Sequence, residues 1–166
     1  MLIRSEIASD IPVIGRVVTE ALRMLPQSTG TEAAIVERLR AEDGLMLSLI
    51  AEEEGEVLGY LAASEASIGG EGGWGLIGPL AVLPSRHGEG IGSVLMMEAL
   101  RRLQSPCRGA VLVGDPAYYG RFGFRAFPGL GVSGCPPEAV QALPFDESRP
   151  DGEVIHHPAF GLNQKQ

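Results

Sequence analysis

Three glycines alternate with other residues immediately before a segment whose apolar residues recur at helical spacing. They are Gly88, Gly90 and Gly92, within RHGEGIGSVLMMEALRRL at positions 86–103. Glycine leaves backbone N–H groups open to an approaching anion and accepts positive φ angles. A helix that begins there adds the unpaired N–H groups of its first turn and the positive end of its dipole. The spacing predicts a phosphate-binding site, with a flexible connector as the alternative.

The elements on both sides of the glycines indicate how this site is positioned. The helix after them has an apolar stripe made of Gly92, Leu95, Met96, Ala99, Leu100 and Leu103. Its other side carries Glu98, Arg101 and Arg102. The flanking segments 76–83 and 110–114 are almost entirely apolar, as expected of strands buried on both faces. We therefore expect a strand, a crossover helix and a parallel strand, with the glycines at the carboxyl end of the first strand.

Two other phosphate-binding patterns can be compared with this stretch. A P-loop is excluded because no Gly-Lys-Ser/Thr sequence follows the glycines. A dinucleotide site is nearly matched by Gly88, Gly90 and Ser93, with Asp115 as the acidic residue after the next strand. However, four residues separate the preceding strand from the glycines, and only one parallel crossover is evident. Dinucleotide binding is the more remote alternative.

The remaining chain alternates predicted helices and strands. Helices are expected from Asp10 to Leu25, from Thr31 to Gly44, from Pro116 onward and briefly over 137–143. Strands are expected over 1–7, 46–52, 56–64, 124–127 and 153–160. Gly55 should turn a hairpin, whereas the glycine-rich residues 68–75 should form a loose turn. Residues 128–152 form a Pro- and Gly-rich segment near the C-terminus.

Composition limits the class of protein. The 166 residues are 45% hydrophobic and 20% charged, which is typical of one soluble domain spanning 1–166. A net charge of −8 argues against binding to nucleic acid or to an anionic membrane. No leader and no apolar run of about 20 residues is present, so we expect a cytoplasmic protein. Cys107 and Cys135 match no metal spacing, and His156 and His157 should face opposite ways, so no metal is expected.

The segments PLAVLPSRHGEGIGSVLM and YGRFGF resemble the Gcn5-related N-acetyltransferase (GNAT) superfamily. GDPAYYGRFGF is similar in particular to the bacterial branch of small predicted acetyltransferases. The resemblance implies an α/β (α+β) fold, a mixed and centrally splayed sheet flanked by helices. The family signature is Gln or Arg, two residues, Gly, one residue, then Gly or Ala. Gly90 and Gly92 fill the small positions, but His87 stands at the Gln or Arg position and Arg86 lies one place early.

The resemblance also implies roles for individual residues, with acetyl-CoA as cosubstrate. The residues expected to bind coenzyme A are Leu80, Ala81 and Val82 along the pantetheine arm, and His87, Gly88, Glu89, Gly90, Ile91, Gly92 and Ser93 around the pyrophosphate. A backbone amide of the strand would stabilise the oxyanion. Tyr119, five residues before Phe124, is the expected acid for the leaving thiolate. The strand carries no carboxylate, so the base stays open between Glu65 and ordered water.

The implied reaction is transfer of an acetyl group from acetyl-CoA to a primary amine. The acceptor is a small molecule or a protein amino group, and residues 24–31 and 128–152 would flank its pocket. Because His87 departs from the signature and the strand lacks a carboxylate, a non-catalytic or regulatory coenzyme A-binding module is the alternative. A homodimer is left open.

Overall fold

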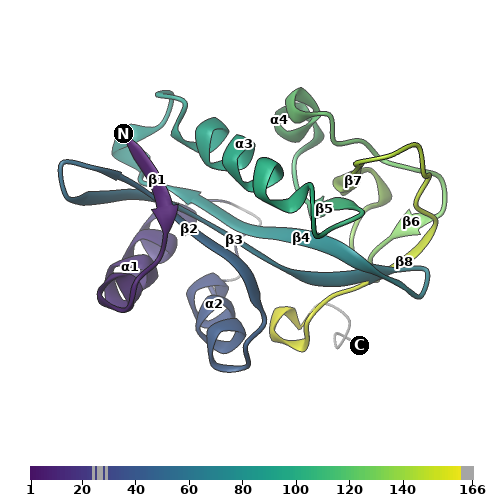
Figure 1. The fold of residues 1–166 in the computed structure, drawn as a ribbon, viewed down its shortest axis with the longest axis horizontal. Coiled ribbons are helices and arrows are strands. Elements are labelled where there is room, and N and C mark those ends of the chain that lie inside the picture. The colour runs from purple at the N-terminus through teal and green to yellow at the C-terminus, as the bar shows by residue number, and fades with distance from the viewer. Residues whose placement is uncertain (24, 26–27, 29, 162–166) are drawn as a thin grey trace. The chain divides into compact units, whose positions relative to one another are not determined.

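The structure is a computed structural model that describes residues 1–161 except 24, 26, 27 and 29. It divides into two compact units. The first consists of Met1–Ala63 and Gly78–Ala99, and the second of Ser64–Ile77 and Leu100–Gln166. Two strands and one helix contribute residues to both units: β3 (Glu56–Ile68), β4 (Glu71–Val82) and α3 (Ile91–Leu103). Figure 1 labels the helices and strands of both units.

The first unit is a set of strands covered on both faces by helices. Its further elements are β1 (Leu2–Ser5), α1 (Ile11–Leu22), α2 (Glu32–Ala41) and β2 (Leu45–Glu53), with short 3-10 turns at Ala8–Asp10 and Pro84–Arg86. The strand order is β1-β2-β3-β4, and β1 runs antiparallel to β2 with Leu2 opposite Glu52. Helices α1 and α2 lie on one face and α3 on the other (Figure 1).

Packing in the first unit explains these two covered faces. One buried cluster joins α1, α2 and three strands through Ile14, Val17, Val18, Ala21, Val36, Ile50, Val57, Tyr60, Ala62 and Ala81. On the opposite face, a Cβ added to Gly59 would lie 3.1 Å from a methyl carbon of Leu95 and 3.2 Å from one of Ile91. Glycine at position 59 therefore lets the first turns of α3 pack closely on β3.

The second unit contains the β3-β4 hairpin end and the remaining strands. Its further elements are β5 (Gly109–Val113), α4 (Pro116–Tyr119), β6 (Leu130–Gly131), β7 (Val140–Pro144) and β8 (Gly152–Ile155), with 3-10 turns at Gly120–Phe122, Pro137–Ala139 and Pro158–Phe160. The order is β3-β4-β5-β7, and β8 pairs with both β3 and β6. The β4-β5 ladder is parallel, with Trp74 opposite Gly109 and Leu76 opposite Val111, whereas β5 and β7 are antiparallel.

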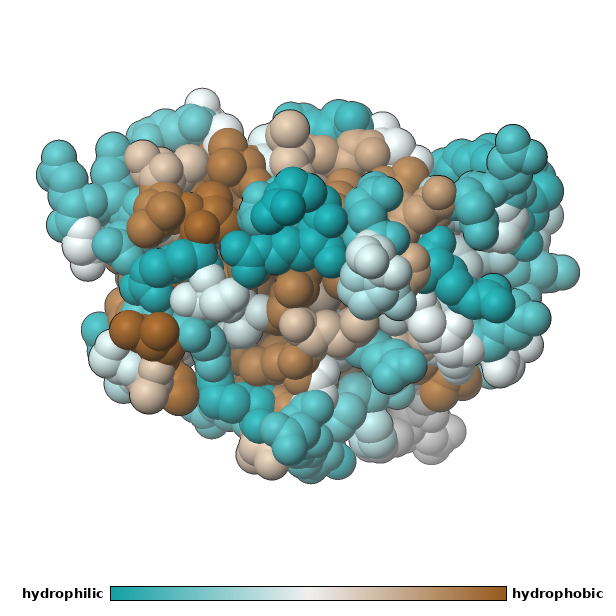
Figure 2. Space-filling view, viewed as in Figure 1, coloured by the Kyte–Doolittle hydropathy of each residue, from teal (hydrophilic) through white to brown (hydrophobic). Residues whose placement is uncertain are grey.

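A second buried cluster forms the core of this unit. Its members are Ala66, Ile68, Trp74, Leu76, Val111, Phe127, Leu130, Val132, Val140, Ala142 and Val154. These side chains come from strands and from the connection between β5 and β7, so their burial ties that long segment to the sheet. On the face shown in Figure 2, hydrophobic and hydrophilic residues are interspersed. No helix among residues 1–161, as far as they are described, is long and apolar enough to cross a membrane.

The predicted α/β class with a mixed sheet is confirmed. The described strands number eight and include parallel and antiparallel pairs. The β2-β3 hairpin turns at Glu54 and Gly55, which both have positive φ (52° and 84°), as a tight two-residue turn requires. The parallel pair β4 and β5, with α3 between them in sequence, is also as expected.

The prediction of a loose turn over residues 68–75 is wrong. Strand β3 continues to Ile68 and β4 begins at Glu71, so the turn is only Gly69 and Gly70, with φ of 59° and 86°. The further glycines of this stretch lie within β4, and one of them, Gly75, is closely packed. A Cβ on Gly75 would lie 3.1 Å from a methyl carbon of Leu103. Gly75 therefore marks close packing of a strand rather than a loop.

Three predictions near the C-terminus need correction. The helical patch over 137–143 is a 3-10 turn followed by β7, because Val140 and Ala142 alternate into the core and pair with β5. The strand expected over 124–127 reduces to one bridge between Arg125 and Ala142. The last strand, β8, ends at Ile155, before the 3-10 turn at Pro158–Phe160, instead of spanning 153–160.

Asp10 and Thr31 precede α1 and α2, and as residue types that favour helix starts both would be expected to cap these helices. Neither Asp10 nor Thr31 makes a side-chain capping bond to its helix. Asp10 instead accepts two hydrogen bonds from Arg4, at 2.9 and 3.1 Å, and one from the Ile7 N–H at 2.7 Å. The Arg4 guanidinium holds the pKa of Asp10 below its usual value, so this carboxylate stays charged and joins β1 to the start of α1.

Candidate active site

The glycine loop, residues 87–93, connects β4 to α3 in the first unit. Gly88 and Gly90 have φ of 83° and 84°, and a Cβ added to either would meet no atom within 4 Å. Backbone conformation, rather than crowding within the unit, therefore requires glycine at these two positions. Gly92 lies in the first turn of α3 and is not among the positive-φ glycines. Positive φ is thus a property of two of the three glycines.

Backbone N–H groups of the glycine loop are available to a ligand. The amide of His87 donates to the Pro84 carbonyl, and the amide of Val94 donates to the Gly90 carbonyl. Between them, the amides of Gly88 to Ser93 have no acceptor among the residues that the structure describes. They precede and begin a 13-residue helix, whose dipole favours an anion at this end. The arrangement can hold a phosphate or pyrophosphate through backbone atoms alone.

The end of β4 presents backbone groups on the edge away from β3. The Leu83 amide donates to the Leu58 carbonyl at 2.9 Å, so residue 83 faces β3. Alternate residues of a strand point their N–H and C=O groups to opposite edges, which turns those of Val82 and Leu80 away from β3. The Val82 carbonyl accepts from Nε2 of His87 at 2.9 Å. By this alternation the N–H groups of Leu80 and Val82 and the Leu80 carbonyl lie on the edge away from β3.

His87 stands where the family signature has Gln or Arg, and Arg86 lies one place before it. Both side chains form hydrogen bonds within the protein. The His87 imidazole links the glycine loop to the end of β4. Arg86 donates to Glu53 at 2.7 Å and to Glu89 at 2.9 Å. The hydrogen bond from Arg86 lowers the pKa of Glu53, and both carboxylates raise the pKa of Arg86. Arg86 therefore compensates the negative charges beside the loop, a contact that no spacing in the sequence indicated.

Tyr119, the predicted acid, lies at the end of α4 in the second unit. Helix α4 begins after Asp115, whose Oδ1 accepts the Ala117 N–H at 2.9 Å. The Tyr119 ring packs edge-on against Tyr118 and Phe124, with centroids 4.9 and 6.3 Å apart. Burial of the ring, with smaller contributions from Tyr118 and Asp115, raises the pKa of Tyr119 to about 12. Its hydroxyl is therefore neutral at pH 7, as that of an unperturbed tyrosine also is, and the raised pKa makes it a weaker acid.

Tyr118 has a different environment from its neighbour. Its ring contacts Phe122, one helical turn later in the sequence, at a centroid distance of 5.6 Å. The guanidinium of Arg121 lies 4.5 Å from the centre of the Tyr118 ring. Tyr118 is thus held between an aromatic ring and a cation, so it serves as a matched control for Tyr119.

The other candidate groups have structural contacts. Nδ1 of His156 lies 3.0 Å from the His157 carbonyl oxygen, and Nδ1 of His157 accepts the Ala159 N–H at 2.9 Å. Glu65, the possible base, is exposed in the second unit. Cys107 is buried, and both cysteines are free. Within the described residues, no group of three or more His, Cys, Asp or Glu side chains could hold a metal ion.

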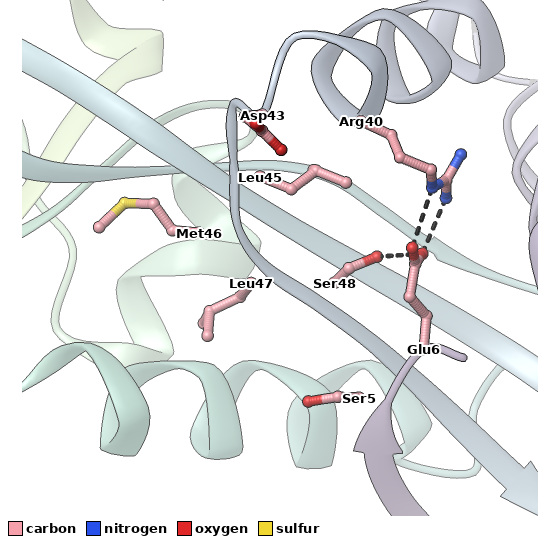
Figure 3. A pocket seen from close by; sticks show the side chains of 8 residues that line it. All are labelled: Ser5, Glu6, Arg40, Asp43, Leu45, Met46, Leu47 and Ser48. Atoms are coloured by element: carbon pink, nitrogen blue, oxygen red, sulfur yellow. Dashed lines mark hydrogen bonds and ion pairs between the residues drawn. The ribbon is translucent and has the colours of Figure 1, made fainter. Parts of the chain in front are cut away.

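A pocket of about 290 Å³ in the first unit contains none of the predicted site residues (Figure 3). It is lined by Ser5, Glu6, Arg40, Asp43, Leu45, Met46, Leu47 and Ser48. Arg40 donates twice to Glu6, at 2.8 and 2.9 Å, and the Ser48 hydroxyl lies 2.6 Å from that of Tyr60. Burial alone would raise the pKa of Glu6, but hydrogen bonds from Arg40 and Ser48 lower it. These bonds join α2 to β1 and β2 and account for the polar lining.

The predicted site residues fall into two groups. The first unit contains Leu80 to Val82 and, after four intervening residues, His87 to Ser93. The second unit contains Tyr119. The segment 24–31, expected beside the acceptor, lies partly outside the described residues. The first group offers backbone donors at a helix start and a strand edge, and the second offers one neutral hydroxyl.

Comparisons with known proteins identify the family of the chain. Residues 17–124 match the Acetyltransferase (GNAT) family. The chain is 40% identical over 128 residues to the uncharacterized N-acetyltransferase YhbS of Escherichia coli K12, covering 75% of this chain and 74% of that protein. A crystal structure of YhbS in complex with CoA has a TM-score of 0.87 and 32% identity, covering 96% of this chain and 91% of that chain.

A second solved structure is similar over nearly the whole chain. It is a GNAT family acetyltransferase from Brucella melitensis in complex with acetyl-CoA, with a TM-score of 0.85 and 43% identity. The match covers 96% of this chain and 97% of that one. With a family match over residues 17–124 and relatives of 40% identity over three quarters of their length, this chain belongs to the GNAT acetyltransferase family.

Proposed function

We propose that the protein is an N-acetyltransferase that uses acetyl-CoA and acts on a primary amine. The observation that supports this most directly is the glycine loop, with unpartnered amides from Gly88 to Ser93 at the start of α3. Their number and placement fit a pyrophosphate. The two similar solved structures contain CoA and acetyl-CoA, the ligands that this loop would hold.

The end of β4 would hold the pantetheine arm and the reacting carbonyl. The β4-β5 ladder covers Trp74 to Leu76, and β4 continues to Val82. The groups of Leu80 and Val82 on the edge away from β3 are suited to hydrogen bonds with the amides of pantetheine. Acetyl-CoA would supply the thioester that the amine attacks. A backbone N–H of this segment would then stabilise the negative charge on the carbonyl oxygen.

Proton transfers complete the reaction. The attacking amine must be neutral, so its proton passes to water or to Glu65. When the carbon–sulfur bond breaks, the electron pair goes to sulfur. Tyr119 would give its phenolic proton to that sulfur, and the proton that the attacking nitrogen loses as it becomes an amide would pass through water to restore the phenol, so the products are the amide and the thiol. Before this step Tyr119 carries its proton at neutral pH, as an unperturbed tyrosine also does.

The most informative experiment measures thiol release from acetyl-CoA with a panel of polyamines, amino acids, aminoglycosides and peptides. We expect turnover with at least one amine. Calorimetry should show tighter binding of acetyl-CoA than of NAD. Binding of acetyl-CoA without turnover on any amine would favour the coenzyme A-binding module, and tighter binding of NAD would restore the dinucleotide interpretation.

A further inference from the structure

Gln141 in β7 is a polar side chain with an exposed fraction of only 1%. Its Nε2 donates to the Gly114 carbonyl at 3.0 Å and to the Ala139 carbonyl at 3.3 Å. Its Oε1 is buried and has no partner among the described residues. Because the amide N–H groups point at two carbonyl oxygens, the orientation of the amide is determined and Oε1 must face elsewhere.

Burying the Gln141 amide with its Oε1 unpartnered lowers the stability of the folded state, and packing does not require a polar side chain here. A buried acceptor without a donor destabilises the folded state, whereas an apolar side chain of the same length would avoid that loss. The benefit of Gln141 must therefore lie in the groups to which its amide donates. Both are carbonyls of the chain segments that flank the end of β5.

Gly114 is fixed on both of its backbone groups. Its N–H donates to the Ala139 carbonyl at 2.9 Å, and its carbonyl accepts from Gln141. The next residue, Asp115, accepts the Tyr119 N–H at 3.0 Å through its own carbonyl. The turn between β5 and α4 is therefore held at both ends. Gln141 bonds to Gly114 at its start, and the Tyr119 N–H bonds to Asp115, the next residue.

The same glycine also supports the Tyr119 ring directly. A Cβ added to Gly114 would lie 2.5 Å from Cε2 of Tyr119, so the ring rests against this α-carbon. Phe124 contacts the ring edge-on, with a centroid distance of 6.3 Å. Movement of the Gly114 peptide would therefore displace the ring and change the burial of its hydroxyl.

We infer that Gln141 is a positioning residue that holds Gly114 and, through it, the Tyr119 hydroxyl in the orientation needed to donate a proton. The inference rests on the proposed role of Tyr119 as the acid. It goes beyond that role because it names a side chain in β7, 22 positions after Tyr119 in the sequence, that acts only through the backbone.

The test is a double-mutant cycle between Gln141→Met and Tyr119→Phe. Methionine keeps the length of the side chain and removes its N–H donors. With the most active amine of the panel, Gln141→Met should lower kcat about tenfold in the parent protein and by less than about twofold in the Tyr119→Phe protein. The dissociation constant of acetyl-CoA should stay within about twofold. Gln104→Met, the same change at an exposed position, is the control.

A second measurement needs no amine substrate and therefore does not depend on turnover. Tyrosine labelled at Cζ gives one carbon resonance for each of Tyr60, Tyr118 and Tyr119. In Gln141→Met the Tyr119 resonance should move and titrate at lower pH than in the parent protein, while Tyr60 should not change. Gln141→Glu adds a pH test: its rate relative to the parent should recover as pH falls, because only the protonated carboxyl group can donate to a carbonyl.

The outcomes separate this inference from the proposed function. Equal losses from Gln141→Met with and without the Tyr119 hydroxyl would overturn the inference, as would an unchanged Tyr119 resonance. Full turnover in Tyr119→Phe alone would overturn the acid role, and the carbon resonance would then decide whether Gln141 positions Tyr119. If Gln141→Met does not fold, the rate ratio and resonance of Gln141→Glu give the same decision.

Discussion

The glycine loop and the surroundings of Tyr119 are built in opposite ways. In the glycine loop the candidate groups are backbone amides on an exposed segment, and the side chains of Arg86 and His87 bond to the protein. At Tyr119 the candidate group is one side chain, held by ring packing and by a turn fixed at Gly114. The loop should therefore tolerate side-chain changes but not changes of backbone conformation. The Tyr119 region should show the reverse.

The largest expected effect is on turnover when the Tyr119 hydroxyl is removed. Tyr119→Phe keeps the ring and its packing but should lower kcat about 10²-fold, the low end for a lost general acid, because a thiolate leaves fairly well unaided. Affinity for acetyl-CoA, measured by calorimetry, should hardly change. Tyr118→Phe is the control. If only Tyr118→Phe lowers the rate, Tyr118 and not Tyr119 is the acid.

The next effect concerns the backbone of the glycine loop. Gly90→Val should weaken acetyl-CoA binding by about tenfold or more, because a β-branched residue disfavours the positive φ that presents the amides. Gly134→Val is a matched control, since Gly134 also has positive φ (88°) and no atom within 4 Å of an added Cβ. Equal affinity in parent and Gly90→Val proteins, both folded by circular dichroism, would rule out binding through this loop.

A smaller effect is expected from the charge beside the loop. Arg86→Gln leaves Glu53 and Glu89 uncompensated, so binding of the anionic coenzyme should weaken about threefold at low salt and less at high salt. Arg16→Gln, an exposed arginine on α1, controls for the change in net charge. A loss that does not depend on salt would indicate that Arg86 acts on loop geometry instead.

The smallest effect concerns the pH dependence of kcat/KM, to which titration of Tyr119 should contribute nothing below about pH 10. The pKa of Tyr119 is raised above its usual value of 10 to about 12, so the protonated donor is fully present below pH 10 and is lost only as pH rises through 12. Between pH 7 and about 10, kcat/KM should therefore rise only as the acceptor amine loses its proton. A descending limb in this range that disappears in Tyr119→Phe would show that the hydroxyl titrates lower and is less buried in solution.

Much of the fold follows from local patterns in the sequence. The β2-β3 hairpin depends on a two-residue turn at Glu54 and Gly55, and α3 (Ile91–Leu103) on an apolar stripe that runs from Gly92 to Leu103. Secondary structure was predicted wrongly where the same residue types are compatible with two kinds of structure. The glycines of residues 68–75 suggest a loop, but Gly75 lies in β4 and leaves room for Leu103. Residues 137–143 suggest a helix, but 140–143 pair with β5. Such contacts involve partners far away in sequence.

The candidate site divides in the same way. The sequence by itself determined the glycine loop, because backbone donors require glycine spacing and a helix start, which are both local. It also indicated Tyr119 through the resemblance of the residues around it. Only the tertiary structure decided that Arg86 bonds to Glu53, that His87 bonds to Val82 and that Gln141 reaches Gly114. These contacts join separate elements, and their hydrogen bonds depend on the packing of the folded chain rather than on residue spacing.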